Sequence, residues 1–296
     1  MNILITGGTG FLGSSLAASL TQKGHQLYIL TRTPDNHEDT DKTTYIGYDR
    51  QAESLPAIDA VINLAGESLF GYWTEKKKQT IKDSRLEITR HLIDLLRQMK
   101  QKPAVFISGS AVGYYGMSEE LIFTEATEDP GNGFLAEVCT KWEAAASQAK
   151  SLGIRTVYAR FGVILGKEGG ALPLMSLPVK LFAGGKIGSG EQWMSWIHLQ
   201  DAVDLMEFCL FTPSVEGPVN FTAPSPRRNK DFTRILAQVL KRPYWLPAPT
   251  LLMVAVLGEM SQLIRKGQYV YPEKALHRGF TFTFPRPKEA LEDIRP

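Results

Sequence analysis

The chain has 296 residues, and 33 Lys and Arg stand against 31 Asp and Glu, so its formal net charge is +2. Apolar residues make up 43% and charged residues 22%. This balance is typical of a globular protein. It excludes a largely disordered chain and argues against a dedicated nucleic-acid binder, in which basic residues would dominate. The two cysteines exclude a disulfide framework and a zinc-finger spacing.

The apolar runs are short. The run that begins at Met1 meets glycines after Thr6 and lacks the basic lead-in of a signal peptide. The run from Leu251 to Leu257 falls well short of the ~20 residues that a bilayer requires. Because the chain has so few cysteines, we predict that it resides in the reducing cytoplasm. From the short apolar runs and the balanced charge we predict no membrane or nucleic-acid partner. It leaves open whether the chain forms a homodimer.

The first two-thirds of the chain alternates short β-branched runs with longer helical patterns. In chain order we predict strand Asn2–Thr6, helix Phe11–Gln22, strands Gln26–Thr31, Thr43–Tyr48 and Ile58–Leu64, helix Thr74–Met99, strand Ala104–Ser108, helix Phe134–Ser151 and strand Ile154–Arg160. Alternation of strands and helices, with strands that are apolar on both faces, predicts an α/β fold with a Rossmann-type doubly wound parallel sheet.

Glycine and proline become frequent beyond Gly166, and the regular alternation ends. We therefore predict a Rossmann domain over residues 1–166 and a smaller C-terminal α+β substrate lobe over residues 167–296. The short strands Ser195–His198 and Val219–Thr222 are expected to return part of this lobe to the sheet. Alternating aromatic residues in Gly279–Pro285 predict a half-buried strand near the C-terminus.

The clearest functional motif is the glycine-rich turn Thr6–Gly13, which follows a strand and opens a helix. In a dinucleotide-binding turn Gly7 would permit the tight bend, Gly10 would let the backbone approach a pyrophosphate, and Gly13 would let the helix pack on the strand. The helix N-terminus would supply free N–H donors for the phosphates. The alternative is a glycine-rich turn without a ligand.

The end of the second strand indicates which dinucleotide is bound. An NAD site carries Asp or Glu there for the ribose hydroxyl, whereas this chain has Arg32. Because a guanidinium pairs bidentately with a phosphate, Arg32 favours NADP(H). A solvated surface arginine is the alternative. At the end of the fourth strand, the small residues of Leu64-Ala65-Gly66 would let a cofactor lie close to the sheet edge.

With these motifs the sequence resembles the short-chain dehydrogenase/reductase superfamily in its extended and atypical branches. It is most similar to epimerase-family proteins, which combine an NAD-dependent epimerase/dehydratase domain with a family-specific C-terminal domain, here about residues 245–296. The resemblance extends over nearly the whole chain and rests on Thr6–Gly13, Asn63–Ser68, Trp73–Arg85, Ser108–Gly116, Lys141–Ala145, Arg160–Gly166, Trp196–Asp201 and Gly279–Pro285.

The resemblance implies a set of cofactor residues. Arg32 would meet the 2′-phosphate, Arg85 would reach toward the cofactor from the long helix, and Ile164 would lie near the nicotinamide. The remaining implied contacts are Gly7, Thr9, Gly10, Phe11, Leu12, Gly13, Leu64, Ala65 and Gly66. For Arg85, a surface ion pair with Asp83 or Glu87 is an equal alternative.

The catalytic residues depart from the family pattern. The superfamily uses a Ser on the fifth strand, which Ser110 matches, and a Tyr four residues before a Lys, which Lys141 matches. Glu137 stands where that tyrosine would be, and the helix contains no tyrosine.

Three interpretations follow from the missing tyrosine. Tyr114 or Tyr115 transfers the proton from the other side of the pocket; Glu137 does so with a pKa raised by burial; or the protein binds NADP(H) without turnover. For Glu137 and Lys141 we favour a simple i,i+4 ion pair.

Two further features stand near the expected substrate pocket. His198 either approaches the substrate or caps a turn. The loop Gly184–Trp193 either closes over the pocket or is a long surface loop. The histidines show no metal-ligand spacing. The sequence thus predicts an NADP(H)-dependent oxidoreductase or epimerase-like enzyme of unknown small-molecule substrate, with a non-catalytic NADP(H) sensor as the alternative.

Overall fold

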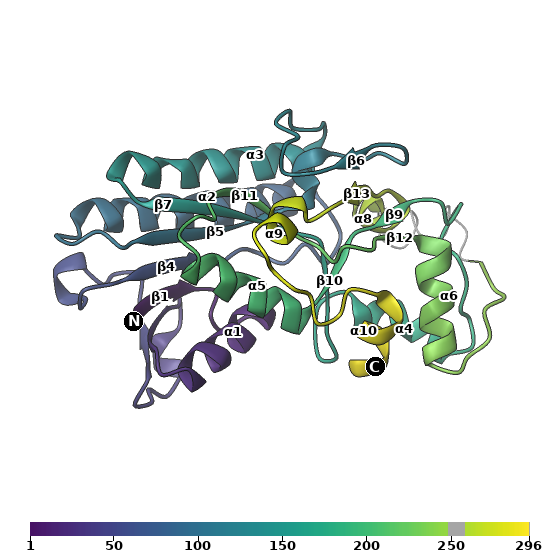
Figure 1. The fold of residues 1–296 in the computed structure, drawn as a ribbon, viewed down its shortest axis with the longest axis horizontal. Helices are drawn as coiled ribbons and strands as arrows, with labels where there is room; N and C mark the ends of the chain where they lie inside the picture. The colour runs from purple at the N-terminus through teal and green to yellow at the C-terminus, as the bar shows by residue number, and fades with distance from the viewer. Residues whose placement is uncertain (248–257, 296) are drawn as a thin grey trace.

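Seven parallel strands form the central sheet of the molecule (Figure 1). The computed structural model describes residues 1–247 and 258–295, so the run from Leu251 to Leu257 lies outside the described residues. The strands of the sheet are β1 (Asn2–Thr6), β2 (Gln26–Leu30), β3 (Thr43–Ile46), β4 (Ala60–Asn63), β5 (Val105–Ala111), β7 (Arg155–Phe161) and β11 (Gly217–Phe221). Their order is β3-β2-β1-β4-β5-β7-β11. This order reverses direction next to β1, as in a doubly wound sheet, so the predicted α/β fold is confirmed.

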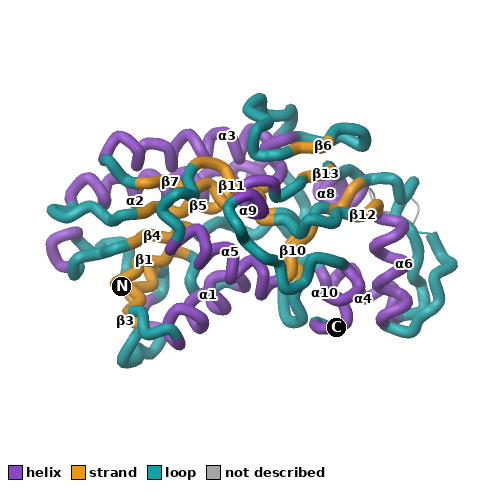
Figure 2. Tube along the Cα trace, in the orientation of Figure 1, coloured by secondary structure: helices purple, strands orange, loops and turns teal. Residues whose placement is uncertain are grey.

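Helices cover both faces of the sheet because successive side chains of each strand point in opposite directions. On β1, Ile3 and Ile5 pack with the apolar residues of α1 (Phe11–Gln22) and α5 (Leu199–Phe211). Leu4, between them, packs with α2 (Glu75–Gln98) and α3 (Phe134–Ser147) on the other face. Figures 1 and 2 show these two helix layers above and below the strands.

The element predictions for the first two-thirds of the chain are confirmed with small changes in their bounds. Thr74 is not part of α2 but caps it, since its side chain accepts a hydrogen bond from the Lys77 N–H. The predicted helix over Phe134–Ser151 is α-helical to Ser147 and continues as a 3₁₀ helix over Gln148–Leu152. β5 runs three residues further than predicted, to Ala111, and so carries Ser110 within the sheet.

Beyond β7 the chain builds a second group of elements beside the sheet. Its helices α4 (Leu172–Lys180), α6 (Asn229–Val239) and α10 (Pro287–Asp293) surround a separate apolar cluster that includes Trp196 and Phe232. Two further helices in the described part of this group are α8 (Gln262–Arg265) and α9 (Glu273–His277). Three pairs of short strands connect the group: β8 (Val163–Leu165) with β10 (Trp196–His198), β9 (Trp193–Met194) with β12 (Arg227–Arg228), and β6 (Ile122–Phe123) with β13 (Tyr269–Val270).

Both short strands predicted in this part of the chain are present, but only one joins the sheet. β11 pairs with β7 at the sheet edge. β10 pairs instead with β8, with Ile197 opposite Ile164. The boundary near residue 166 and the substrate role of the second group remain predictions.

The prediction of a strand over Gly279–Pro285 is wrong, because this segment pairs with no strand among the described residues. Phe280 and Phe282 are buried, and Thr281 and Thr283, which alternate with them, are exposed, as the alternation predicted. The backbone N–H groups of Thr283 and Phe284, however, donate to the two carboxylate oxygens of Asp201 at 2.7 and 3.0 Å. The buried Asp201 carboxylate thus accepts the hydrogen bonds that a neighbouring strand would otherwise accept.

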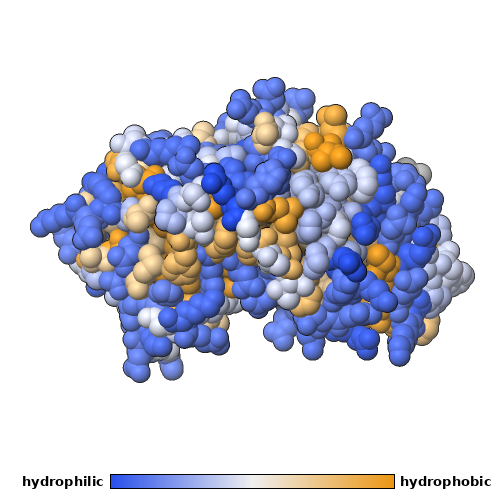
Figure 3. All heavy atoms as spheres, in the orientation of Figure 1, coloured by the Kyte–Doolittle hydropathy of each residue, from blue (hydrophilic) through white to orange (hydrophobic). Residues whose placement is uncertain are grey.

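Among the described helices, none is long and apolar enough to cross a membrane. On the face shown in Figure 3, hydrophilic residues cover most of the surface and apolar residues gather in separate patches.

Candidate functional site

The glycine-rich turn lies at the carboxyl end of β1, at the centre of the sheet. Gly7 adopts a left-handed backbone with φ of 70°, and its carbonyl accepts a hydrogen bond of 3.0 Å from the Gly10 N–H. Helix α1 begins immediately afterwards at Phe11, and within the described chain no side chain caps it. Its first N–H groups therefore remain available for an anion such as a pyrophosphate.

The packing around the turn admits no side chain at two of its glycines. A Cβ atom at Gly7 would lie 2.7 Å from the backbone carbonyl of Leu64, and one at Gly13 would lie 2.0 Å from the Gly7 carbonyl oxygen. At Gly10 the closest atom would be 3.2 Å away, so the protein's own packing is less restrictive there. Gly7 and Gly13 are thus required by the turn itself, and Gly10 leaves room beside the helix N-terminus, as a pyrophosphate cradle requires.

Arg32 follows β2 at the same edge of the sheet. Its side chain is exposed, and among the described residues it forms no hydrogen bond or ion pair. Its charge acts on the Glu67 carboxylate, whose pKa is lowered mainly by a hydrogen bond from Lys77 and further by Arg32 and Arg85. Arg32 and Arg85 both act on this carboxylate, which belongs to the loop that follows β4.

Arg85 points into the site rather than along the helix surface. Its Nη1 donates to the backbone carbonyls of Glu67 at 3.1 Å and Ile81 at 2.9 Å. Within residues 1–247 and 258–295 it forms no ion pair with Asp83 or Glu87. A Cβ atom at Gly66 would come within 3.1 Å of the Arg85 guanidinium carbon. The structure thus brings Arg85 against the Leu64–Gly66 loop, and its contact with a cofactor remains a prediction.

A buried polar network connects the ends of the central strands. The Thr6 hydroxyl donates to Asn63 at 2.7 Å, and the Asn63 amide donates to Thr89 at 2.9 Å and to Ser108 at 3.4 Å. The Trp142 indole N–H donates to Thr89 at 3.0 Å. Sequence reasoning missed this network. The signal for it was a polar residue at the carboxyl end of each of three apolar strands.

Ser110 lies further along β5 than Ser108. It pairs with Arg160 on β7, which in turn pairs with Asn220 on β11. Its hydroxyl donates to Glu143 Oε1 at 2.6 Å. Glu143 also accepts two hydrogen bonds of 2.8 Å from Arg160. All three side chains are buried. Since the Ser110 proton is engaged by a carboxylate, its oxygen offers lone pairs rather than a donor to any neighbouring group.

Two tyrosines complete this cluster in different environments. The Arg160 guanidinium lies 3.5 Å from the centre of the Tyr114 ring, and the Tyr114 hydroxyl donates to the Glu128 carbonyl at 2.6 Å near the surface. Tyr115 is buried, and its hydroxyl donates to Asn220 at 2.8 Å. Burial raises the pKa of Tyr115 to about 12. A phenol with so high a pKa is poorly suited to proton transfer near neutral pH, so Tyr114 is the better placed of the two.

The inward face of α3 carries Cys139, Trp142 and Glu143, and Lys141 lies outside it. Lys141 forms the expected ion pair with Glu137 at 2.6 Å, and both side chains are about half exposed at 51% and 49%. That hydrogen bond lowers the pKa of Glu137, the opposite of the shift that acid catalysis near neutral pH would need. The structure does not bring Lys141 to Ser110.

Cys139 lies on the buried face of α3, two residues before Lys141. Burial, with the Glu143 charge, raises the pKa of its thiol to about 11. A buried, protonated thiol cannot supply the positive charge of a lysine.

Other predicted residues occupy supporting positions. Ile164 lies on β8, and the glycines Gly166, Gly169 and Gly170 that follow pack closely against the Phe11 ring at the start of α1. His198 caps α5 by accepting the Gln200 N–H at 3.0 Å, so its structural role is confirmed.

The loop Gly184–Trp193 is fixed to the start of α6, with Asn229 accepting the Ile187 N–H at 3.0 Å. The Lys230 N–H in turn donates to the Gly190 carbonyl at 3.0 Å. Its closure over a substrate remains a prediction.

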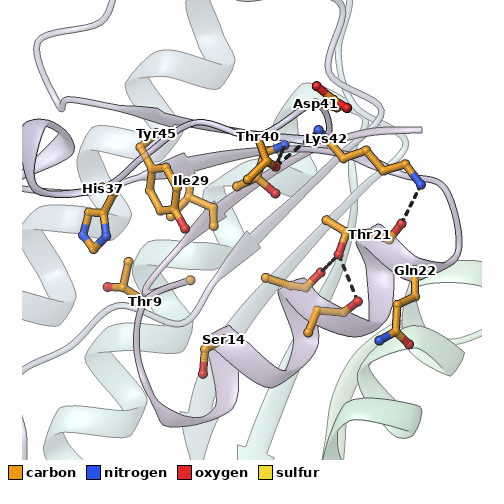
Figure 4. A pocket seen from close by; sticks show the side chains of 14 residues that line it. Thr9, Ser14, Thr21, Gln22, Ile29, His37, Thr40, Asp41, Lys42 and Tyr45 are labelled. Atoms are coloured by element: carbon orange, nitrogen blue, oxygen red, sulfur yellow. Dashed lines mark hydrogen bonds between the residues drawn. The ribbon is translucent and has the colours of Figure 1, made fainter.

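A cavity of about 760 Å³ adjoins the turn on the other side from Ser110. It extends between α1 and β3 and is lined at one end by Gly8 and Thr9. Figure 4 shows Ser14 and Thr21 of α1 facing it from below, and His37 and Tyr45 from the strand side. The cavity therefore belongs to the surroundings of the glycine turn.

Comparison with known proteins identifies relatives along the whole chain. The family model described as "NAD dependent epimerase/dehydratase family" matches residues 3–221, and a domain of unknown function (DUF1731) matches residues 248–294. A Bacillus subtilis epimerase family protein, YfhF, is 47% identical over 99% of this chain and 98% of its own.

Solved structures show the same similarity. The human epimerase family protein SDR39U1, crystallised with NADPH, is 34% identical with a TM-score of 0.89 over 99% of both chains. A nucleoside-diphosphate sugar epimerase from Corynebacterium glutamicum is 30% identical with a TM-score of 0.81 over 99% of this chain and 58% of its own. These findings agree with the resemblance stated from the sequence, including the separate C-terminal domain.

Proposed function

Because this chain belongs to the NAD dependent epimerase/dehydratase family, we propose that it is an NADP(H)-dependent oxidoreductase or epimerase-like enzyme acting on a small hydroxyl or carbonyl compound. The observation that carries the proposal is the Gly7–Gly13 turn, whose backbone is bent and packed for a pyrophosphate at the start of α1. The NADPH in the crystal structure of the human relative supports the choice of nicotinamide cofactor.

Arg32 supports the phosphorylated form of the cofactor. Its guanidinium stands at the end of β2, exposed and without a partner among the described residues. We assign it to the 2′-phosphate, which it can bind bidentately. Arg85 and Leu64–Gly66 would line the next part of the cofactor, and Ile164 the nicotinamide.

A bound nicotinamide would supply or accept a hydride at the substrate carbon. The chain's own task is then to hold the substrate oxygen and move its proton. Ser110 and Tyr114 are the residues that we assign to these tasks. Ser110 pairs with Arg160 in the sheet, and the Arg160 guanidinium lies 3.5 Å from the centre of the Tyr114 ring. We assign no step to Lys141, since its ammonium would first have to leave Glu137.

Three observations favour a second candidate, an NADP(H)-binding sensor without turnover. The Ser110 proton is donated to Glu143, Tyr115 has a raised pKa, and α3 carries no tyrosine. The serine is therefore engaged, the family tyrosine is missing, and Tyr115 is unsuited to replace it.

An absorbance assay separates the two candidates. The protein is incubated with NADPH and a broad panel of aldehydes and ketones, and NADPH oxidation is followed. The enzyme predicts turnover that falls at least about a hundredfold in Ser110→Ala and in Tyr114→Phe, but not in the control Tyr28→Phe. Tight NADPH binding without turnover of any compound would favour the sensor.

A further inference from the structure

Helix α4 presents an apolar face to the outside of the molecule. Leu174, Leu177 and Leu181 follow one another at helical spacing along α4 and its C-cap, and they are 57%, 53% and 68% exposed. The opposite face of the helix is buried through Leu172 and Val179. A helix usually buries its apolar stripe and exposes polar residues, so an apolar outer face indicates a surface that contacts something else.

The apolar surface continues beyond the end of α4. Phe182, Trp245 and Leu246 are exposed large side chains. The Trp245 indole N–H donates to the Phe182 carbonyl at 2.8 Å, and the Leu246 N–H donates to the Gly184 carbonyl at 3.0 Å. These bonds hold the two segments together, so the six side chains form one surface, which we call the α4 surface.

Positive charges gather beside this surface. A cavity of about 380 Å³ is lined by Lys180, Lys241, Arg242 and Arg295, and no acidic side chain lines it. Within the described chain none of these four residues forms an ion pair, whereas many other surface cations do. The Arg242 guanidinium lies 4.6 Å from the centre of the Phe182 ring, which places the cations directly against the apolar residues.

The ends of α4 and α6 carry a second, independent signal. Each helix ends in a Schellman motif: Phe182 and Ala183 donate to Val179 and Pro178, and Lys241 and Arg242 donate to Gln238 and Ala237. The motif needs a left-handed residue, which is usually glycine. Phe182 and Lys241, with φ of 62° and 54°, are the non-glycine residues with positive φ in the described chain.

Three other helices of the molecule end in the usual way, with a glycine in the left-handed position. Gly24, Gly153 and Gly279 occupy the same position with φ of 86°, 76° and 89°, and a Cβ atom would meet no neighbour at any of them. Within residues 1–247 and 258–295, large side chains take this glycine-favoured position only at the ends of α4 and α6. Such strain is typical of positions whose side chain is needed for contact with a partner.

We propose that the α4 surface and its four cations dock this protein on a bilayer surface that contains anionic phospholipid. Exposed Leu, Phe and Trp side chains flanked by Lys and Arg are the pattern of peripheral membrane binding, in which apolar residues enter the interface and cations meet the headgroups. Such a surface would lie on the bilayer rather than cross it, so it requires no membrane-spanning helix. Unpaired cations favour an anionic lipid surface over a second copy of this chain, which would bring the same positive charges together.

The test is co-sedimentation of the full-length protein with vesicles of phosphatidylcholine alone or mixed equally with phosphatidylglycerol. We expect binding to the anionic vesicles only, and weaker binding at high salt. Lys180→Glu/Arg242→Glu should reduce it at least about tenfold. The matched control Arg90→Glu/Lys100→Glu, with Arg90 on α2 and Lys100 just beyond its end, should leave binding within about twofold. Leu177→Ser/Leu181→Ser should also lose binding.

Phe182→Gly/Lys241→Gly separates a docking role from a structural one. Because glycine relieves the left-handed strain, this variant should unfold at the same or a higher temperature than the wild type while its vesicle binding falls at least about tenfold. Absence of wild-type binding to anionic vesicles, or unchanged binding in this variant, would overturn the proposal. So would light scattering that shows a wild-type dimer converted to a monomer by Leu177→Ser/Leu181→Ser.

Discussion

The Gly7–Gly13 turn and the Ser110–Glu143–Arg160 cluster occupy the same edge of the sheet but are built in different ways. The turn is made of backbone: its geometry excludes a Cβ atom at Gly7 and Gly13. The cluster is made of side chains that converge from β5, α3 and β7. A backbone constraint must appear in the sequence as glycine, whereas a side-chain cluster depends on which face each helix turns inward. The two regions therefore differ in how they should respond to substitution.

The largest effect is expected at Glu143. Glu143→Gln leaves the buried Arg160 charge without its partner, which should lower the free energy of unfolding by about 3–5 kcal/mol in urea denaturation. The comparison is Glu137→Gln on the same helix, which breaks an exposed pair of similar length and should cost about 0.2–1 kcal/mol. If the two variants lost equal stability, burial would not be what distinguishes the cluster.

A double variant sharpens this result. Glu143→Gln/Arg160→Met removes both charges, so it should be more stable than Glu143→Gln alone. A double variant that is no more stable than the single one would show that the loss at Glu143 does not come from the unpaired arginine.

Substitutions in the glycine turn are expected to weaken cofactor binding. A methyl group at Gly13 would meet the Gly7 carbonyl oxygen at 2.0 Å, so Gly13→Ala must displace the turn. We expect NADPH affinity, measured by fluorescence titration, to fall about a hundredfold, or roughly 2.7 kcal/mol.

The matched control for the turn is Gly24→Ala. It also lies at a helix end but has open space around it, so it should cost about 1 kcal/mol of stability and leave affinity unchanged. Equal loss of affinity in both variants would contradict a specific role for the turn.

The next smaller loss of NADPH affinity is expected at Arg32, and it tests the cofactor assignment. Arg32→Ala removes a charge-assisted contact worth about 1.5–3 kcal/mol, so NADPH should bind at least about tenfold more weakly, with NADH changed less than twofold. Arg90→Ala, the same change on the outer face of α2, should alter neither affinity. Equal weakening of both nucleotides by Arg32→Ala would refute the 2′-phosphate assignment.

The effect that is smallest near neutral pH concerns Tyr115, because it appears only at high pH. Its folded-state pKa of about 12 lies above the ordinary value near 10, so the folded state retains a proton that the unfolded state loses. Stability should therefore fall as pH rises from 10 toward 12, by up to about 2.7 kcal/mol relative to Tyr115→Phe. Denaturation of both proteins from pH 7 to 11 measures this difference, which should be constant below about pH 9. A difference that already changes near pH 8 would place Tyr115 among the candidates for proton transfer.

Much of the fold could be predicted because its signals are local. Ile3 and Ile5 face one helix layer and Leu4 the other, so β1 is apolar throughout, as a strand covered on both faces must be. The Gly279–Pro285 segment shows the limit. Its alternating burial was predicted correctly, but its backbone donors are satisfied by Asp201, a residue about eighty positions away that no local pattern reveals.

The candidate site likewise has one part that could be predicted from the sequence and one part that could not. The turn and Arg32 could be located because their positions follow from one strand and one turn. The cluster could not, because Cys139, Glu143 and Lys141 are close in sequence and only the packing of α3 decides which of them face Ser110. The Glu143–Arg160 pair joins residues from α3 and β7 that only the folded sheet brings together.

Isothermal titration of the wild-type protein with NADPH and then with NADH tests the central claim most directly. The account predicts one site per chain and an affinity for NADPH at least about tenfold higher than that for NADH. No heat with either nucleotide, or equal affinity for both, would contradict it.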